Sequence, residues 1–438
     1  MNIKELIGQQ VIFLDGGMGT MLQSKGLDPG DPPERFNVIN PNAVKEVHTA
    51  YLEAGSNVVL TNTFGANRLN YSAEEAEQLI CAGIDIAREA ISGLAEPGNR
   101  FVGLDIGPSG QLMEPYGDLS FEDAVDIFAE MIKAGVKHGV DLIVIETMSD
   151  LYETKAALLA AKENSDLPVF VSNTYQQSGR LMTGADPLTM IVMLEGLGAD
   201  AVGMNCSVGP EQLTPVAETY LKYASVPVLV KPNAGLPRMD GDRVAYDITA
   251  DTFACLTAGF AKKGAKILGG CCGTTPEYIS LLVKNVSENA PAQGSGSFDQ
   301  ETGALATETG RMISSRMISS HMTALSLDEL DLSSVPRLEG ATVDELVDSA
   351  YDEEDEADVL LLDTSNIAEN EKAFLEEAVF EIQSAVRNPL MITARDPEAL
   401  EAALRVYKGK ALIRPAENSG DHPDILKKLV DKYGGIIC

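Results

Sequence analysis

The chain contains eight short apolar runs within about its first 285 residues, and each is followed by a polar or glycine-rich segment and then a helix-forming stretch. Alternation of β-branched runs with Ala-, Glu- and Leu-rich segments is typical of successive βα units around a parallel sheet. Eight such units favour a closed (β/α)8 TIM barrel over an open, doubly wound sheet. The runs lie at residues 11–15, 57–64, 101–107, 141–147, 168–175, 201–207, 227–235 and 265–273.

All eight runs also turn polar or glycine-rich toward their carboxyl ends. One such residue usually caps a helix or forms a turn. In a barrel, however, the carboxyl ends of all the strands meet at one face, where active sites lie. Eight polar ends out of eight therefore predict a functional rim made of Asp15, Asn62, Asp105, Glu146, Asn173, Asn205, Asn233 and Cys271.

The rest of the 438-residue chain predicts a second, smaller domain. Residues 289–324 are rich in Gly, Ser, Thr and Ala and are expected to be a linker, with one pentapeptide, RMISS, occurring twice in succession at 311–320. Residues 325–438 then read as β, α, β, α, β, α, β. We therefore expect a barrel over 1–288, a linker, and a small α/β domain resembling half a barrel.

Charge and hydropathy exclude several partners. The chain has 33 Lys and Arg against 66 Asp and Glu, a formal net charge of -33, which would repel nucleic acid and anionic membranes. No run approaches about 18 apolar residues, and the start of the chain is too polar for a signal peptide. A cytoplasmic location without a membrane segment is expected.

The most specific chemical signal is a set of three cysteines. Cys271 and Cys272 are adjacent in GGCCGTTP at 269–276, and Cys206 lies in MNCSVG at 204–209. Free cysteines are often small core residues, but the glycines beside the pair permit close backbone approach and unusual φ angles. Three thiolates with an open fourth position fit a catalytic Zn²⁺. Such a site is a poor activator of water but holds an added thiolate in nucleophilic form, which favours thiol alkylation.

Seven motifs occur in order across residues 5–288. They are LDGGMGTMLQ, LTNTFGANR, GLDIGPSG, VIETMSD, MNCSVGP, VKPNAGLP and GGCCGTTPEYI. Together they resemble the homocysteine S-methyltransferase family. The resemblance implies a zinc-dependent barrel in which Cys206, Cys271 and Cys272 are the catalytic metal ligands. It also implies a homocysteine pocket lined by Asp15, Glu146 and Asn233, whose carboxylates suit a substrate ammonium.

Segments 369–383 and 396–413 resemble the pterin-binding barrel that follows this domain in cobalamin-dependent methionine synthases. The polar pairs expected there are replaced by MITAR at 391–395 and by Arg414 with Pro415, and only about half a barrel is present. We therefore expect residues 325–438 to bind no folate and to mediate contact with another copy or a partner.

Together these features predict an enzyme that moves a methyl group to the thiolate of homocysteine, giving methionine. The methyl donor would be bound elsewhere or delivered by a partner, through a corrinoid protein or a methyltetrahydrofolate route. Two alternatives stay open: a methyltransferase for another thiol or selenol acceptor, and a non-catalytic metal-binding assembly module.

Overall fold

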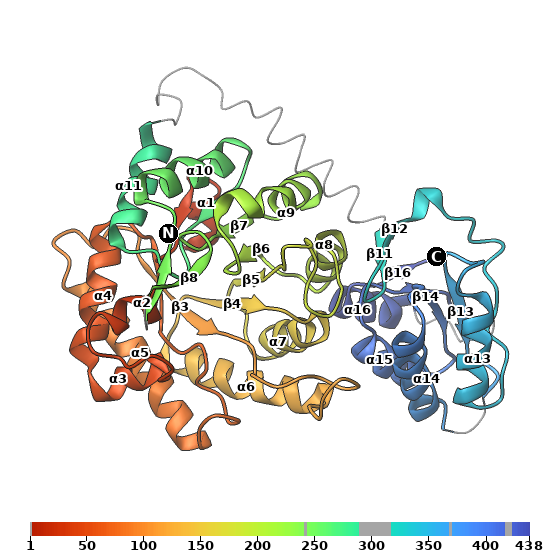
Figure 1. The fold of residues 1–438 in the computed structure, drawn as a ribbon. Coiled ribbons are helices and arrows are strands. Elements are labelled where there is room, and N and C mark those ends of the chain that lie inside the picture. Colours follow the sequence, from red (N-terminus) through yellow and green to blue (C-terminus); the bar gives the residue numbers. More distant parts are fainter. Residues whose placement is uncertain (1, 241–242, 289–316, 368–369, 417–422) are drawn as a thin grey trace. The chain divides into compact units, whose positions relative to one another are not determined.

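The computed structural model describes residues 2–240, 243–288, 317–367, 370–416 and 423–438. The chain divides into two compact units, one made of Met1–Met182 with Ala199–Thr307 and the other of Thr183–Gly198 with Glu308–Cys438. Each unit is described by itself below, and Figure 1 shows the elements of both.

Eight parallel strands of the first unit form a (β/α)8 barrel. Their order in the sheet is β1-β10-β7-β6-β5-β4-β3-β2, and a bridge between Leu14 and Val58 closes the ring. Each strand overlaps one of the eight predicted runs, and β4 alone extends beyond its run, by one residue, so the predicted fold is confirmed. The strands are β1 (Ile12–Phe13), β2 (Val58–Leu60), β3 (Phe101–Ile106), β4 (Leu142–Met148), β5 (Val169–Asn173), β6 (Ala201–Asn205), β7 (Val228–Lys231) and β10 (Ile267–Leu268).

Helices of the first unit lie outside these strands (Figure 1). Several of these helices are preceded by a Ser, Thr or Asp whose side chain accepts a hydrogen bond from the backbone N–H three residues later. Ser72 before α5 and Ser120 before α6 are two examples. None of the described helices is both long and apolar enough to cross a membrane. The main helices are α4 (Pro41–Glu53), α5 (Ala73–Ser92), α6 (Phe121–His138), α7 (Leu151–Asn164), α9 (Pro210–Tyr223), α10 (Ala250–Lys262) and α11 (Pro276–Glu288); the short helices α2 (Met18–Gln23) and α3 (Phe36–Ile39) follow β1.

The inside of the barrel is filled with apolar side chains. The short helix α1 (Ile3–Ile7) contributes Ile3, Leu6 and Ile7, which pack with inward-facing strand residues. The strand residues of this cluster are Ile12, Leu14, Val58, Leu60, Phe101, Leu142, Val144, Phe170, Ala201, Leu229 and Ile267. The inside of the barrel is therefore a packed core. A ligand can be bound only at the carboxyl ends of the strands.

One element of the first unit was not predicted. We expected a turn and a helix directly after the seventh strand, but an antiparallel hairpin of β8 (Pro237–Asp240) and β9 (Arg243–Tyr246) comes before α10. Its sequence signal is the Gly-Asp pair at 241–242, between two short strand-like segments. The apolar run at 227–235 predicts one strand leading into a helix, and this prediction is wrong for the segment between β7 and α10.

The second unit has a parallel sheet in the order β13-β14-β15-β16, with helices between successive strands, as the sequence predicts. Helix α8 (Pro187–Gly196) also belongs to this unit and contacts β11. The elements are β11 (Met317–Ser319), β12 (Ala324–Ser326), α13 (Val343–Glu353), β13 (Leu360–Asp363), α14 (Glu371–Ala385), β14 (Leu390–Thr393), α15 (Pro397–Val406), β15 (Leu412–Ile413), α16 (Pro423–Tyr433) and β16 (Ile436–Ile437).

Most of the expected linker lies outside the described residues, because the structure describes nothing from 289 to 316. The first RMISS copy is among the residues left out. Three residues of the second copy, Met317–Ser319, form β11, which pairs with β12 in an antiparallel hairpin. Strand structure thus begins before residue 325, where we expected the second domain to start.

Candidate active site

A layer of polar side chains lies above the apolar core of the barrel. Residues of a strand alternate between the two faces of the sheet. In β3, Phe101 belongs to the barrel core, so Asp105, four positions later, also lies on the inner face. In β7, Leu229 belongs to the core, so Lys231, two positions later, lies on the inner face as well. Counting every second residue from the core residues in this way gives a layer of polar side chains on the inner face of the barrel. Its members are Asp105, Glu146, Ser172, Asn205 and Lys231.

Lys231 is the only lysine of this layer, and it is paired with carboxylates. Its side chain is 2% exposed, with Nζ 2.7 Å from Oε2 of Glu146 and 3.9 Å from Oδ1 of Asp15. Burial alone would lower the pKa of Lys231, but the charges of Glu146 and Asp15 outweigh burial and hold this pKa above its usual range. Lys231 is therefore a permanent cation inside the barrel.

Two carboxylates beside this lysine are short of partners. Burial raises the pKa of Asp15 to about 7, although Lys231 and the N–H of Leu60, which donates to Oδ2 over 2.8 Å, both act to lower it. Burial, followed by the charge of Glu146, raises the pKa of Asp105 well above its usual range. Among the described residues, the buried Oδ1 atoms of Asp15 and Asp105 accept no hydrogen bond. The pocket thus has more carboxyl groups than Lys231 can pair with.

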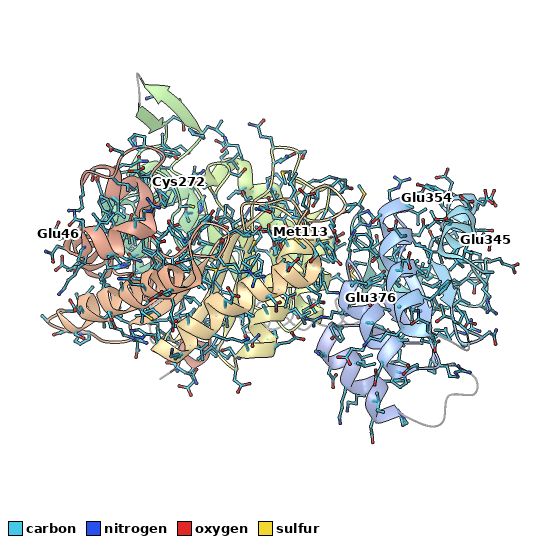
Figure 2. All side chains as sticks on the ribbon, turned by 90° about the horizontal axis from the view of Figure 1, so that it is seen from below. Glu46, Met113, Cys272, Glu345, Glu354 and Glu376 are labelled. Atoms are coloured by element: carbon cyan, nitrogen blue, oxygen red, sulfur yellow. The ribbon has the colours of Figure 1, made fainter. Side chains whose placement is uncertain are left out.

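The three predicted metal ligands lie together at the same rim. Cys206 directly follows β6, while Cys271 and Cys272 follow β10, and β7 separates these strands in the sheet. The three sulfur atoms all lie within 4.8 Å of one another, and those of Cys206 and Cys272 are 3.9 Å apart. Figure 2 labels Cys272 among the side chains of the first unit. Cys206 has a φ of 61°, a strained conformation of the kind that concentrates at functional sites.

Neighbouring groups fix the loop that holds the cysteine pair. The N–H of Cys272 donates to Oδ1 of Asn233 over 3.1 Å, and the N–H of Cys271 donates to the carbonyl of Pro232 over 2.9 Å. Gly273 has a φ of 79°, and a Cβ atom there would lie 2.2 Å from a ring carbon of Tyr246, which comes from the unpredicted hairpin. The glycine is therefore required by both its conformation and the space around it.

The cysteine cluster fits a tetrahedral metal ion. Two thiolates bound to one zinc at about 2.3 Å lie roughly 3.8 Å apart, close to the 3.9 Å between Cys206 and Cys272. In the absence of a cation, the hydrogen bond to Cys206, together with burial, raises the pKa of the Cys271 thiol well above its usual range. Among the described residues no His, Asp, Glu or fourth Cys joins this cluster. The donor set thus leaves one position open for an added ligand.

The structure separates the predicted site residues by what they contact. It brings the three cysteines together and places Asp15 and Glu146 around Lys231. The side chain of Asn233 contacts the backbone of Cys272. Two other polar strand ends are structural: the amide of Asn62 donates to the carbonyl of Pro33 and to Asn37, while that of Asn173 donates to the carbonyl of Met148 and to Thr154.

We missed Lys231 in the sequence, and we did not separate Asp105 from the other polar strand ends. The signal for Lys231 is a lysine in an otherwise apolar run, PVLVKPN, two positions after an inward core residue.

Comparisons with known proteins give one family and several relatives. The sequence profile described as homocysteine S-methyltransferase matches residues 12–286. A methionine synthase of Mycobacterium leprae is 33% identical over 303 residues, which cover 65% of this chain and 25% of that protein. A methionine synthase of Mycobacterium tuberculosis is 31% identical over 323 residues, which cover 70% of this chain and 27% of that protein. The match thus spans about a quarter of the length of these relatives.

Among solved structures, the metallated form of the homocysteine methyltransferase MmuM from Escherichia coli superimposes with a TM-score of 0.56 and 24% sequence identity. The superposition covers 65% of this chain and 99% of that one. At this identity the likeness shows the barrel fold alone.

The buried carboxylate of Asp15 predicts a pH-dependent effect on stability. Because its pKa is raised from 3.8 to about 7, the folded protein binds an extra proton between these pH values, and stability falls as pH rises through this window. We expect Asp15→Asn to remove this loss. The stability of the variant relative to wild type should then increase from pH 4 to pH 7, by about 1 kcal/mol or more.

Urea unfolding at several pH values measures this difference. Asp126→Asn is the control, because it makes the same Asp-to-Asn change at an exposed position on α6. A difference between Asp15→Asn and wild type that stays constant or shrinks as pH rises would contradict the assignment of a raised pKa to Asp15.

Proposed function

The chain belongs to the homocysteine S-methyltransferase family, and we propose that it transfers a methyl group to the thiolate of homocysteine to form methionine. One observation supports this proposal most strongly: the three-cysteine cluster and the carboxylate pocket lie at the same end of the barrel, and Lys231 contacts both. Lys231 contacts Glu146 through its ammonium group, while its backbone carbonyl accepts the N–H of Cys206 over 3.0 Å. The charge of Glu146 also acts on Cys271. An amino acid with a short thiol side chain can span these two groups.

We propose that Cys206, Cys271 and Cys272 hold one Zn²⁺. When bound there, zinc lowers the pKa of an added thiol, so that the thiol is present as a nucleophilic thiolate at neutral pH. The protein's part is to keep the three ligands close and the fourth position open. Asn233 serves this by holding the backbone of Cys272, at the wall of the proposed homocysteine pocket.

The carboxylates would bind the other end of the substrate. We propose that Asp15 and Glu146 accept hydrogen bonds from the α-ammonium group of homocysteine, which would supply the N–H donors that the pocket lacks. Lys231 keeps Glu146 in place before the substrate enters, because their ion pair is buried and short. The substrate is thereby anchored at its ammonium group while its sulfur points to the cysteine cluster.

The methyl donor is proposed to come from outside this pocket, through a corrinoid protein or a methyltetrahydrofolate route. We propose that residues 325–438, which resemble half of a pterin-binding barrel, bind no folate and instead serve association. At the carboxyl end of β14, the N–H groups of Arg395 and Asp396 donate to Glu371 over 2.9 and 3.1 Å. Because these N–H groups already donate to a side chain of the protein, they are not free to bind a pterin, which supports the proposal.

Loss of any one cysteine of the cluster should remove the metal. We expect Cys206→Ala, Cys271→Ala and Cys272→Ala each to reduce the zinc content from about one per chain to near zero, because two thiolates are too few for a stable tetrahedral site. The fold should persist, because the barrel closes through its own strands. Zinc is measured by elemental analysis and the fold by circular dichroism. Cys255→Ala, at an exposed cysteine on α10, is the control. Full zinc in the triple variant would show that the metal lies elsewhere.

The proposed reaction is tested by methionine formation from homocysteine with four donors: methylcobalamin, methyltetrahydrofolate, S-methylmethionine and betaine. We expect methionine from at least one donor and none from methyltetrahydrofolate alone, and we expect the activity to disappear in Cys272→Ala. Methylation of another thiol or selenol but not of homocysteine would indicate the alternative acceptor. A zinc-loaded protein without activity toward any of these would indicate an assembly module.

A further inference from the structure

The carboxylate pocket contains one acidic group that the proposed function has not used. Asp105 lies in β3 and is 7% exposed, yet its Oδ1 atom is buried and accepts no hydrogen bond from any described residue. Leaving a buried acceptor unpaired is costly, and a core position could be filled by an apolar side chain instead. An unpaired carboxylate oxygen that is buried close to Glu146, Lys231 and Asp15 therefore points to a ligand.

The backbone around Asp105 holds its side chain in a defined direction. The N–H of Asp105 donates to Oγ1 of Thr61 over 3.0 Å, and Oγ1 of Thr63 donates to the carbonyl of Asp105 over 2.8 Å. In the barrel register Asp105 pairs with Val144, two residues before Glu146 on the neighbouring strand. Both acids occupy inward positions, so Asp105 and Glu146 face the same space.

The carboxyl groups around this space outnumber their partners. Three carboxylates, those of Asp15, Asp105 and Glu146, share one cation, because Lys231 is the group that opposes their charges in each case. The Nζ atom of Lys231 lies 2.7 Å from Oε2 of Glu146. The Oδ1 atoms of Asp15 and Asp105 have no hydrogen-bond donor among the described residues. A second cation with several N–H groups would complete the pocket. An α-ammonium group has three N–H donors, one for each carboxylate.

We infer that Asp105 is a third binding residue for the α-ammonium group of the substrate, beside Asp15 and Glu146, and that this carboxylate cage selects thiols that carry an ammonium group. The inference rests on the proposed function, since it assumes that an amino-acid thiol enters this pocket. A thiol without the ammonium group would leave the cage unpaired, and a polar site built for one partner rejects analogues that lack it.

The test compares two ligands that differ in this group alone. L-homocysteine and 4-sulfanylbutanoic acid share a thiol, a carboxylate and a chain of the same length, but only the former has an ammonium group. Calorimetry on the zinc-loaded full chain gives the Kd of each for wild type and for Asp105→Asn. We expect Asp105→Asn to weaken homocysteine binding by roughly 10- to 100-fold, as for loss of a charged hydrogen bond, and to change analogue binding by less than about threefold.

Glu153→Gln is the matched control. Glu153 is also a buried acid, 3% exposed, but its Oε1 already accepts the N–H of Ser109 over 2.7 Å outside the cage. Its replacement should affect the two ligands equally. Asp105→Ser provides a second, smaller replacement, with zinc content and circular dichroism recorded for each variant.

The possible results distinguish this inference from the proposed function. If wild type binds neither ligand, the proposed function is wrong. If wild type binds homocysteine but both Asp105 variants keep its preference over the analogue, or weaken both ligands alike, Asp105 does not contact the ammonium group. Loss of zinc or of the fold in both variants would show that Asp105 serves folding, and would equally overturn the inference.

Discussion

The buried ammonium group of Lys231 is the interaction on which the polar end of the barrel depends. Taking a lysine out of water is costly unless a partner compensates for the lost hydration. Glu146 does so at 2.7 Å, and the side chain of Lys231 is only 2% exposed. The same residue accepts the N–H of Cys206 through its carbonyl. One position of β7 thus connects the carboxylate pocket to the cysteine cluster and fixes both relative to the core.

The site also shows how stability is given up for binding. Asp15 and Asp105 each keep an unpaired buried oxygen, and Cys206 holds a left-handed conformation. Each of these features is unfavourable in the free protein, and none is needed to close the barrel, which the apolar layers below already stabilise. Such costs at a functional site are understandable if a ligand relieves them, because binding then supplies the missing hydrogen bonds.

Much of the architecture could be predicted because it follows from repeated local patterns. The eight apolar runs and their polar ends specify the barrel, and the rarity of cysteine makes Cys206, Cys271 and Cys272 conspicuous. The role of Asp105 could not be separated from those of Asn62 and Asn173, because all three are polar strand ends and only packing distinguishes a binding group from a structural one. The hairpin before α10 was missed because its short strands carry too few residues for a clear periodicity.

The central claim is that homocysteine binds with its sulfur on the metal held by the three cysteines and its ammonium group among the carboxylates. X-ray absorption at the zinc edge of the full chain, with and without L-homocysteine, tests this most directly. The account predicts that zinc has three sulfur neighbours and one lighter neighbour in the free protein, and four sulfur neighbours at about 2.3 Å after homocysteine is added. An unchanged set of three sulfur neighbours at saturating homocysteine would contradict it.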